Sequence, residues 1–586
     1  MDTAQGEHRP PALGPGPSRG AALAALLVTA LCYLLWTFSG FLYIYMDNIT
    51  ISMVASGMFG AGFFCQYIHP LLSLLIRGLS VLLPTADVFA SLVHAALLGG
   101  VFTVSYIGFR LLGGKTLRSR DLTDWLALLA LLLALLFFAL GLKLWSVNYT
   151  VQTAAILAAG LIALSYAADR GEGRGWIAAG SALIGAGWLL RLETDLLFIP
   201  FIGLELLTGL LNAGDKKSAL RRQLRYFGPA LLIAALLLGS KALFNAREPY
   251  ASDNAYNRYR TIVEDYPMEP YQRSGAADAG IDEQTYRLVA GSWVLIDTER
   301  IDTELLRRMA ETGSRGAFAY DRAGLRGALG EMARRLRSTD VYLTVLAALI
   351  ALLTLRNCLA ARSRWLRAEA LLAFLGGFVI LLYFTFRGRA LFRLWQTVLL
   401  AQAAVLLCNA LHIAREPLPE TEKPADRRTR QALALLLLCL PLYYAAGQMI
   451  AHAAFHGPIS PLTSRLNADD SAYAETWQGD GLYIWSNWYT TIPVHFADQN
   501  KLPTQRVMDH NIPVGDWTYG QVYFRDFLET RDAANPASAL IDRPDTYLMD
   551  GFVRELLPYL QQFYGETLHL TEAGEIKGVT AYRLER

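Results

Sequence analysis

The chain has 586 residues, of which 53% are apolar and 18% are charged, and its formal net charge is +2. This balance gives no reason to expect a nucleic-acid partner, and the apolar runs are longer than those of a soluble protein of this size. Several runs continue for about 20 residues, the length of helix that crosses the hydrocarbon core of a bilayer. We therefore expect a multispan membrane protein, with the lipid bilayer as its first partner.

In chain order, a Pro- and Gly-rich tail that we expect to be disordered precedes about eleven transmembrane helices. The predicted spans are 21–45, 87–111, 122–142, 151–168, 176–190, 196–212, 228–245, 340–356, 368–386, 396–413 and 431–450. The predicted regions are a cytoplasmic tail (1–20), a transmembrane core (21–245) with a first outer loop (46–86), an extracytoplasmic helical segment (246–339), C-terminal transmembrane helices (340–450) and an extracytoplasmic α/β domain (451–586). The predicted fold class is mainly α, a polytopic helical bundle with a small C-terminal α/β domain.

Lys and Arg concentrate in alternate short loops, such as 213–227 and 414–430. Cytoplasmic loops carry such an excess of basic residues, so the pattern places the N-terminus in the cytoplasm. An odd number of spans then places the C-terminus outside.

The first outer loop begins with Asp47, directly after the first span. A carboxylate at this depth could act as a general base for a sugar hydroxyl. The alternative is that Asp47 only caps the helix that follows it. Residues 49–60 suggest one short helix, and 71–83 suggest an amphipathic helix lying at the membrane interface.

A second group of charges lies between two closely spaced spans, in LLRLETDLLFIPF at 189–201. Arg191 could bind a phosphate through two parallel hydrogen bonds. The alternative is that Arg191 pairs with Glu193 or Asp195 and only shapes the turn.

Three further arginines, Arg387, Arg389 and Arg393, lie on the outer side, where basic residues are otherwise sparse. An anionic group, such as a lipid phosphate or diphosphate, would compensate their charge. The alternative is that acidic residues of the 246–339 segment pair with them. Lys143, in another short outer turn, could line the same cavity.

The C-terminal domain shows strand-like runs at 482–486, 538–542, 565–570 and 577–584, and a helix-like run at 551–564. The five cysteines show no metal-ligand spacing. The chain lacks a P-loop, a dinucleotide-binding glycine motif and an HExxH motif, so a nucleotide-driven transporter or a zinc protease is not supported.

Several stretches together resemble a bacterial family of multispan membrane proteins of the GT-C glycosyltransferase type. They are MDNITISMVASGMFG and QYIHPLLSLLIRGLSVLLP in the first outer loop, NYTVQTAAILAAG at 148–160, LLRLETDLLFIPF at 189–201, YNRYRTIVEDYP at 256–267 and the Gly388–Arg389 stretch. The resemblance covers most of residues 21–410.

The resemblance implies an enzyme of the bacterial plasma membrane that takes a sugar from a polyprenyl-phosphate carrier and passes it to a glycan or lipid acceptor on the outer face. It implies Asp47 as the catalytic base, with inversion at the sugar carbon if the reaction is a single displacement. The implied phosphate ligands are Arg191, Arg387, Arg389 and Arg393, and the implied further pocket residues are Asn48, His69, Lys143 and Glu193.

One departure from the family concerns Asp47, which is followed by Asn48, where relatives often have two adjacent acidic residues. No metal-ligand set is therefore predicted, although a divalent metal is left open. Two other functions remain as alternatives: a non-catalytic transporter or flippase of lipid-linked glycans, and a membrane scaffold whose C-terminal domain binds a partner.

Overall fold

The computed structural model places most of the chain. It describes residues 19–38, 47–60, 62–113, 148–292, 294–314, 318, 321–338, 341–389, 391–413, 481–485, 502, 505–515, 517–549, 553–576 and 579–586. Two predicted spans, 122–142 and 431–450, and the candidate Lys143 lie outside the described residues.

Within the described residues, seven helices are long and apolar enough to cross a membrane. They are α4 (Val88–Gly113), α6 (Tyr149–Arg170), α8 (Leu192–Leu211), α9 (Lys216–Asn245), α14 (Val341–Ala360), α15 (Arg364–Phe386) and α16 (Phe392–Ile413). Two more predicted spans correspond to the helices α1 (Arg19–Phe38) and α7 (Arg174–Leu190), which are not among these seven. The prediction of a mainly helical membrane bundle is confirmed.

The centre of the bundle is formed by α6 and α16. In the most apolar stretch of each of these helices, 94% of the residues are buried, whereas in α9 only 17% are buried. Small residues explain why α6 can lie so deep. A side chain at Gly160 would come within 3.0 Å of the Gly180 carbonyl oxygen of α7, so the two helices touch through their backbones. Leu232 and Leu236 of α9 are exposed, as expected of side chains that face lipid.

The first outer loop contains two short helices, α2 (Asp47–Ser56) and α3 (Pro70–Leu82). His69 caps α3, because its Nδ1 accepts a hydrogen bond from the Leu71 backbone N–H at 3.1 Å. In α3, Leu72 and Ile76 face the protein, while Leu71, Leu74 and Leu75 are exposed, as predicted for an interfacial helix. The described side chains of α2, by contrast, are buried within the protein.

The outer helical segment and the C-terminal domain complete the architecture. The segment contains α10 (Tyr250–Asp265), η2 (Tyr271–Arg273), α11 (Glu283–Arg287), η3 (Leu288–Ser292), α12 (Thr303–Gly313) and α13 (Arg322–Ser338). The C-terminal domain contains β1 (Leu482–Trp485), α21 (Gln505–His510), β2 (Asn511–Pro513), α22 (Val522–Glu529), α23 (Pro536–Asp542), β3 (Thr546–Met549), α24 (Val553–Tyr564), β4 (His569–Ile576) and β5 (Val579–Glu585).

The C-terminal strands form one mixed sheet in the order β2-β1-β3-β5-β4, with β1 parallel to β2 and β3, and β5 antiparallel to β3 and β4. The small α/β domain is thus confirmed, but the strand predicted at 538–542 is wrong. That run belongs to α23, because the Asn535 side chain caps the Ala537 N–H at 3.1 Å and Pro536 suits the first helical turn.

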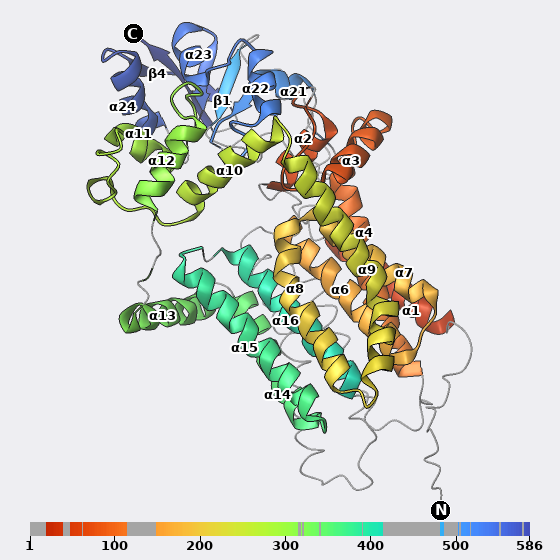
Figure 1. Cartoon of the computed structure of the whole chain (residues 1–586). Coiled ribbons are helices and arrows are strands. Elements are labelled where there is room, and N and C mark those ends of the chain that lie inside the picture. Colours follow the sequence, from red (N-terminus) through yellow and green to blue (C-terminus); the bar gives the residue numbers. More distant parts are fainter. Residues whose placement is uncertain are drawn as a thin grey trace, which may run out of the picture.

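The C-terminal domain docks directly onto the outer loop and the outer helical segment (Figure 1). Phe59, just after α2, packs its ring 4.9 Å from that of Phe527 in α22. Asp297 is fully buried and accepts hydrogen bonds from the hydroxyls of Tyr559 (2.9 Å) and Tyr564 (2.8 Å) in α24. Aromatic and polar contacts therefore hold the C-terminal domain against the first outer loop and the 246–339 segment.

A pH-dependent contact links α10 to the first turn of α22. Asp253 accepts a hydrogen bond from the Val522 N–H at 3.2 Å, and burial raises the pKa of Asp253 from 3.8 to about 6. The Asp253 carboxyl therefore binds a proton more tightly in the folded protein than in the unfolded chain. The contribution of the protonated Asp253 carboxyl to the free energy of unfolding is therefore fully present below pH 4 and is lost as the pH rises through 6.

We therefore expect the native chain to lose stability relative to Asp253→Asn as the pH is raised from 4 to 7. The expected difference is on the order of 1 kcal/mol after allowance for solvent screening. Thermal unfolding at several pH values measures it, with Asp526→Asn on the exposed side of α22 as the matched control. If the stabilities of the native chain and Asp253→Asn changed with pH in parallel, the raised pKa of Asp253 would be contradicted.

Candidate active site

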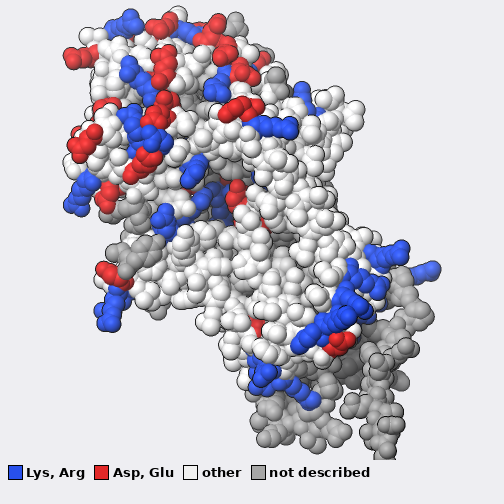
Figure 2. All heavy atoms as spheres, viewed as in Figure 1, with Lys and Arg blue, Asp and Glu red and all other residues white. Residues whose placement is uncertain are grey.

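The candidate base Asp47 forms an ion pair with one of the predicted phosphate ligands. Asp47 begins α2 and Arg393 lies in the first turn of α16, and Oδ2 of Asp47 is 2.9 Å from Nη1 of Arg393. The two side chains are 11% and 25% exposed. In Figure 2, acidic and basic atoms meet in a hollow between the C-terminal domain and the helical bundle. The tertiary structure thus brings together two charges that are 346 residues apart.

Asn48 holds the start of α2 against the start of α6. Its side-chain Oδ1 accepts a hydrogen bond from the Tyr149 N–H at 3.1 Å, and the side chain is fully buried. The side chain of Asn48 thus bonds to the protein backbone, and its neighbour Asp47 is fixed beside the start of α6. Asn48 therefore has a positioning role here.

Arg191 lies at the junction between α7 and α8, within a wall of aromatic and hydroxyl groups. Its Nη1 donates to the Tyr149 hydroxyl (2.5 Å) and to Thr150 Oγ1 (2.6 Å). Its guanidinium carbon lies 4.7 Å from the ring centre of Tyr149 and 5.5 Å from that of Tyr67. The Nε is buried without a hydrogen-bond partner, although Oε2 of Glu193 is 3.6 Å away. The ion pair between Arg191 and Glu193, which the sequence left open as an alternative, is thus present.

Arg389 and Arg387 are engaged by the outer helical segment. Nη2 of Arg389 is 2.8 Å from Oδ2 of Asp265, and both guanidinium carbons lie 5.4 Å from the ring centre of Tyr266. For Arg389, the alternative that the sequence left open, pairing with an acid of segment 246–339, is present. These two arginines thus lie against the C-terminal end of α10.

The structure adds two residues that sequence reasoning missed, Tyr67 and Arg260. Tyr67 lies between Arg191 and Arg260, whose Nη2 donates to the Tyr67 hydroxyl at 3.0 Å. Arg260 also pairs with Glu264. Burial raises the pKa of Tyr67 above its ordinary value, so this hydroxyl stays protonated. The only sequence signal for Arg260 was its place in the YNRYRTIVEDYP stretch.

The remaining predicted pocket residues fit less well. Both ring nitrogens of His69 are used, since Nε2 lies 3.0 Å from the Leu237 carbonyl oxygen and Nδ1 caps α3. Both ring nitrogens of His69 thus hold α3 and α9 in place and are not turned toward the candidate site. The Glu193 side chain is 57% exposed beside Arg191. Among the described residues, no group of three or more His, Cys, Asp and Glu side chains could hold a metal ion.

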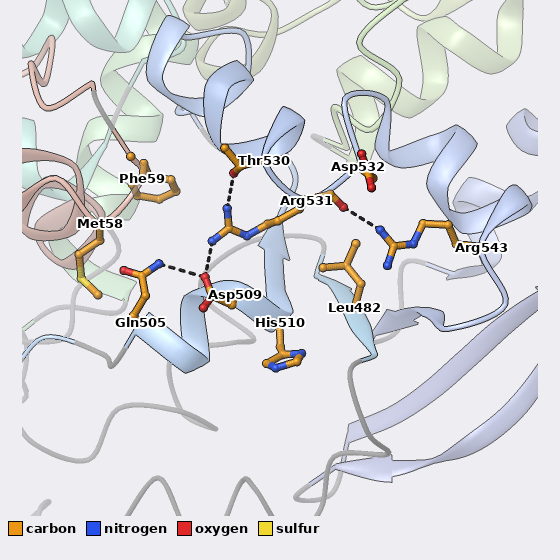
Figure 3. Close-up of a pocket in the computed structure, with 11 residues that line it drawn as sticks. Met58, Phe59, Leu482, Gln505, Asp509, His510, Thr530, Arg531, Asp532 and Arg543 are labelled. Atoms are coloured by element: carbon orange, nitrogen blue, oxygen red, sulfur yellow. Dashed lines mark hydrogen bonds and ion pairs between the residues drawn. The ribbon is translucent and has the colours of Figure 1, made fainter.

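A separate cavity of about 540 Å³ lies between the tip of the first outer loop and the C-terminal domain (Figure 3). Its walls include Met58, Phe59, Asp509, Arg531 and Arg543. Each arginine has a carboxylate partner, because Arg531 pairs with Asp509 at 2.9 Å and Arg543 pairs with Asp545 at 3.0 Å. This cavity has no excess positive charge and is less suited to a phosphate than the hollow at Asp47.

In comparisons with known proteins, no family model and no curated protein matches the chain. Among solved structures, the chain is similar to ArnT from Cupriavidus metallidurans, in a crystal structure bound to undecaprenyl phosphate. The match covers 95% of this chain and 97% of that chain, at 14% identity and a TM-score of 0.40. The assignment of a site rests on the residues described above.

Proposed function

We propose that this chain is a membrane glycosyltransferase that moves a sugar from a polyprenyl-phosphate carrier to a hydroxyl of a glycan or lipid acceptor on the outer face. The observation that carries the proposal is the ion pair formed by Asp47 and Arg393, with Arg191 near enough to interact electrostatically with both and Arg389 paired to the neighbouring Asp265. A carboxylate beside several guanidinium groups supplies both a proton acceptor and an anion site.

In the proposed reaction, Asp47 accepts the proton of the acceptor hydroxyl as its oxygen attacks the anomeric carbon of the sugar. The bond between that carbon and the carrier phosphate breaks, and the phosphate leaves with the electron pair. A single displacement of this kind inverts the configuration at the sugar carbon. The guanidinium groups of Arg393 and Arg191 stabilise the charge that grows on the leaving phosphate in a partly dry site.

Arg393 has two roles in this scheme. Before the donor binds, its guanidinium neutralises and orients Asp47 at 2.9 Å. A planar guanidinium has five N–H donors, so Arg393 can hold a phosphate oxygen while it keeps its contact with the carboxylate. The donor phosphate and the base are then held at adjacent positions, as a displacement at one carbon requires.

The distribution of charge supports an outer-face site in a bacterial plasma membrane with a cytoplasmic N-terminus. In Figure 2, Lys and Arg gather at the end of the bundle away from the C-terminal domain. The first two turns of α9, just after the connection from α8, carry Lys216, Lys217 and Arg221 at that end. The positive-inside rule assigns that end to the cytoplasm, so the hollow at Asp47 opens on the opposite side.

The experiment that tests the proposal uses the full-length protein in nanodiscs with a panel of polyprenyl-phosphate sugars. Release of polyprenyl phosphate is followed over time, with acceptor lipids or glycans added in turn. Release that depends on one donor supports the glycosyltransferase. Donor binding without release would favour the flippase, and absence of binding from a demonstrably folded sample would favour the scaffold.

A further inference from the structure

The helix that carries the candidate base is held by polar contacts at both of its ends. Asp47 begins α2, and the side chain of the next residue, Asn48, accepts a hydrogen bond from the Tyr149 N–H at the start of α6. At the other end, the guanidinium of Arg77 in α3 donates to the carbonyl oxygen of Ser56. A cation is favoured there, because the C-terminal end of a helix carries a partial negative charge.

A third contact holds the middle of α2 against the start of α4. The hydroxyl of Ser52 donates to Oδ1 of Asp87 at 2.7 Å, and the two residues are 1% and 3% exposed. Ser52 follows Asn48 by four residues, so the two side chains project from one face of α2. Hydrogen bonds from one face of α2 therefore connect it to both α4 and α6.

Asp87 also caps α4. Its Oδ1 accepts a hydrogen bond from the Ala90 N–H at 2.8 Å, which is the usual contact of a residue that precedes a helix. A serine at this position could cap α4 as well, so capping alone does not account for the contact with Ser52. One buried oxygen of Asp87 thus connects the first turn of α4 directly to α2.

The contact with Ser52 lies close to the base. Ser52 follows Asp47 by five residues, which is about 7.5 Å along the axis of α2. In a helix of 10 residues, a shift of the middle also displaces the first residue. A displacement of about 1 Å between reacting groups can lower a rate by about 10²-fold. The position of α2 is therefore as important for proton transfer as the presence of the carboxylate.

We propose that Asp87 is a positioning residue, which through its hydrogen bond with Ser52 holds α2 where the Asp47 carboxylate can reach the acceptor hydroxyl. Asp87 acts through Ser52 and does not touch the reacting atoms. The arginines that bind the donor phosphate lie on other helices, so this role concerns turnover and not donor affinity. The inference rests on the proposed glycosyl transfer with Asp47 as its base.

The test compares Ser52→Ala, Asp87→Ser and Asp87→Asn with the native chain, each as full-length protein in nanodiscs. Asp87→Ser can still cap α4 but is too short to reach Ser52 as well, whereas the amide oxygen of Asp87→Asn can accept both hydrogen bonds. We expect about tenfold slower release of polyprenyl phosphate in Ser52→Ala and in Asp87→Ser, with donor affinity within about threefold of native. Asp87→Asn should keep most of the native turnover.

The double variant Ser52→Ala/Asp87→Ser should turn over no more slowly than either single variant, because both changes remove the same contact. The matched control is Ser73→Ala, which removes another fully buried serine hydroxyl of the first outer loop, one that accepts a hydrogen bond from the Cys65 N–H. Thermal unfolding of all variants accompanies the assays, and Ser73→Ala should turn over at the native rate.

Two results would overturn the positioning role alone: native turnover in Ser52→Ala, or equal losses in Asp87→Asn and Asp87→Ser. A loss in Ser73→Ala as large as that in Ser52→Ala would also overturn it, because any buried hydrogen bond of the loop would then have the same effect. Failure of the native chain to release polyprenyl phosphate from any donor is a different result. It would overturn the proposed function, and the positioning role with it.

Discussion

Replacing Asp47 with asparagine is expected to reduce sugar transfer by about 10²- to 10⁴-fold while leaving donor binding within a few-fold of the native value. Asparagine keeps the size of the side chain and still accepts a hydrogen bond from Arg393, but it does not take up the proton of the acceptor hydroxyl. The loss should therefore fall on the turnover number. Release of polyprenyl phosphate and equilibrium donor binding, measured on the same preparation, separate the two effects.

The control for this experiment is Glu283→Gln, which removes an exposed carboxylate from α11, where Glu283 pairs with Arg287. It should turn over at the native rate. Turnover of Asp47→Asn within tenfold of the native rate would remove Asp47 from the role of base. Its contact with Arg393 would then be a structural ion pair that closes the hollow.

Replacing Arg191 with glutamine is expected to lower turnover by about 10²- to 10³-fold, the usual effect of removing one group that stabilises a developing anion. Glutamine can still reach the Tyr149 hydroxyl or Thr150 Oγ1 as a donor, but it carries no charge for the leaving phosphate. Arg191→Lys should restore the activity only in part, since an ammonium group lacks the planar fork of a guanidinium.

Arg258→Gln is the matched control, because Arg258 is an exposed arginine of α10 that stacks on Tyr259. It should leave turnover and donor affinity unchanged. Thermal unfolding of all variants shows whether a loss of activity reflects a loss of fold. A stable Arg191→Gln protein with native turnover would show that Arg191 serves only to shape the junction between α7 and α8.

Part of the site was accessible from the sequence because charges stand out in apolar surroundings. Asp47 and Arg191 border membrane spans, where each charge is costly and therefore conspicuous. Tyr67 and Arg260 gave no comparable signal, since tyrosine and arginine are ordinary residues of an outer loop and a soluble helix. Their importance comes from tertiary contacts, because the Arg191 guanidinium lies over the Tyr67 ring while Arg260 donates a hydrogen bond to the Tyr67 hydroxyl.

The C-terminal domain shows a different limit. The run at 538–542 in α23 fits a short strand as well as a short helix, because five residues are too few to show a clear hydrophobic period. Capping by Asn535 and the proline that follows it decide for the helix. The contact between Asp87 and Ser52 was not predicted at all, because an aspartate before a span and a serine in a short helix are each ordinary residues.

By itself, the sequence determined the helical membrane bundle, the likeness of its outer loop to a GT-C enzyme and the candidate base, because span length and the placement of charge are local properties of the chain. Only the tertiary structure decided which arginine reaches Asp47, that Asp265 engages Arg389, and that Asp87 accepts a hydrogen bond from Ser52. Those contacts depend on how closely and in what register the helices pack. The close approach of α6 and α7 at Gly160 and Gly180 shows that such packing rests on pairs of residues from different helices, which no single stretch of sequence reveals.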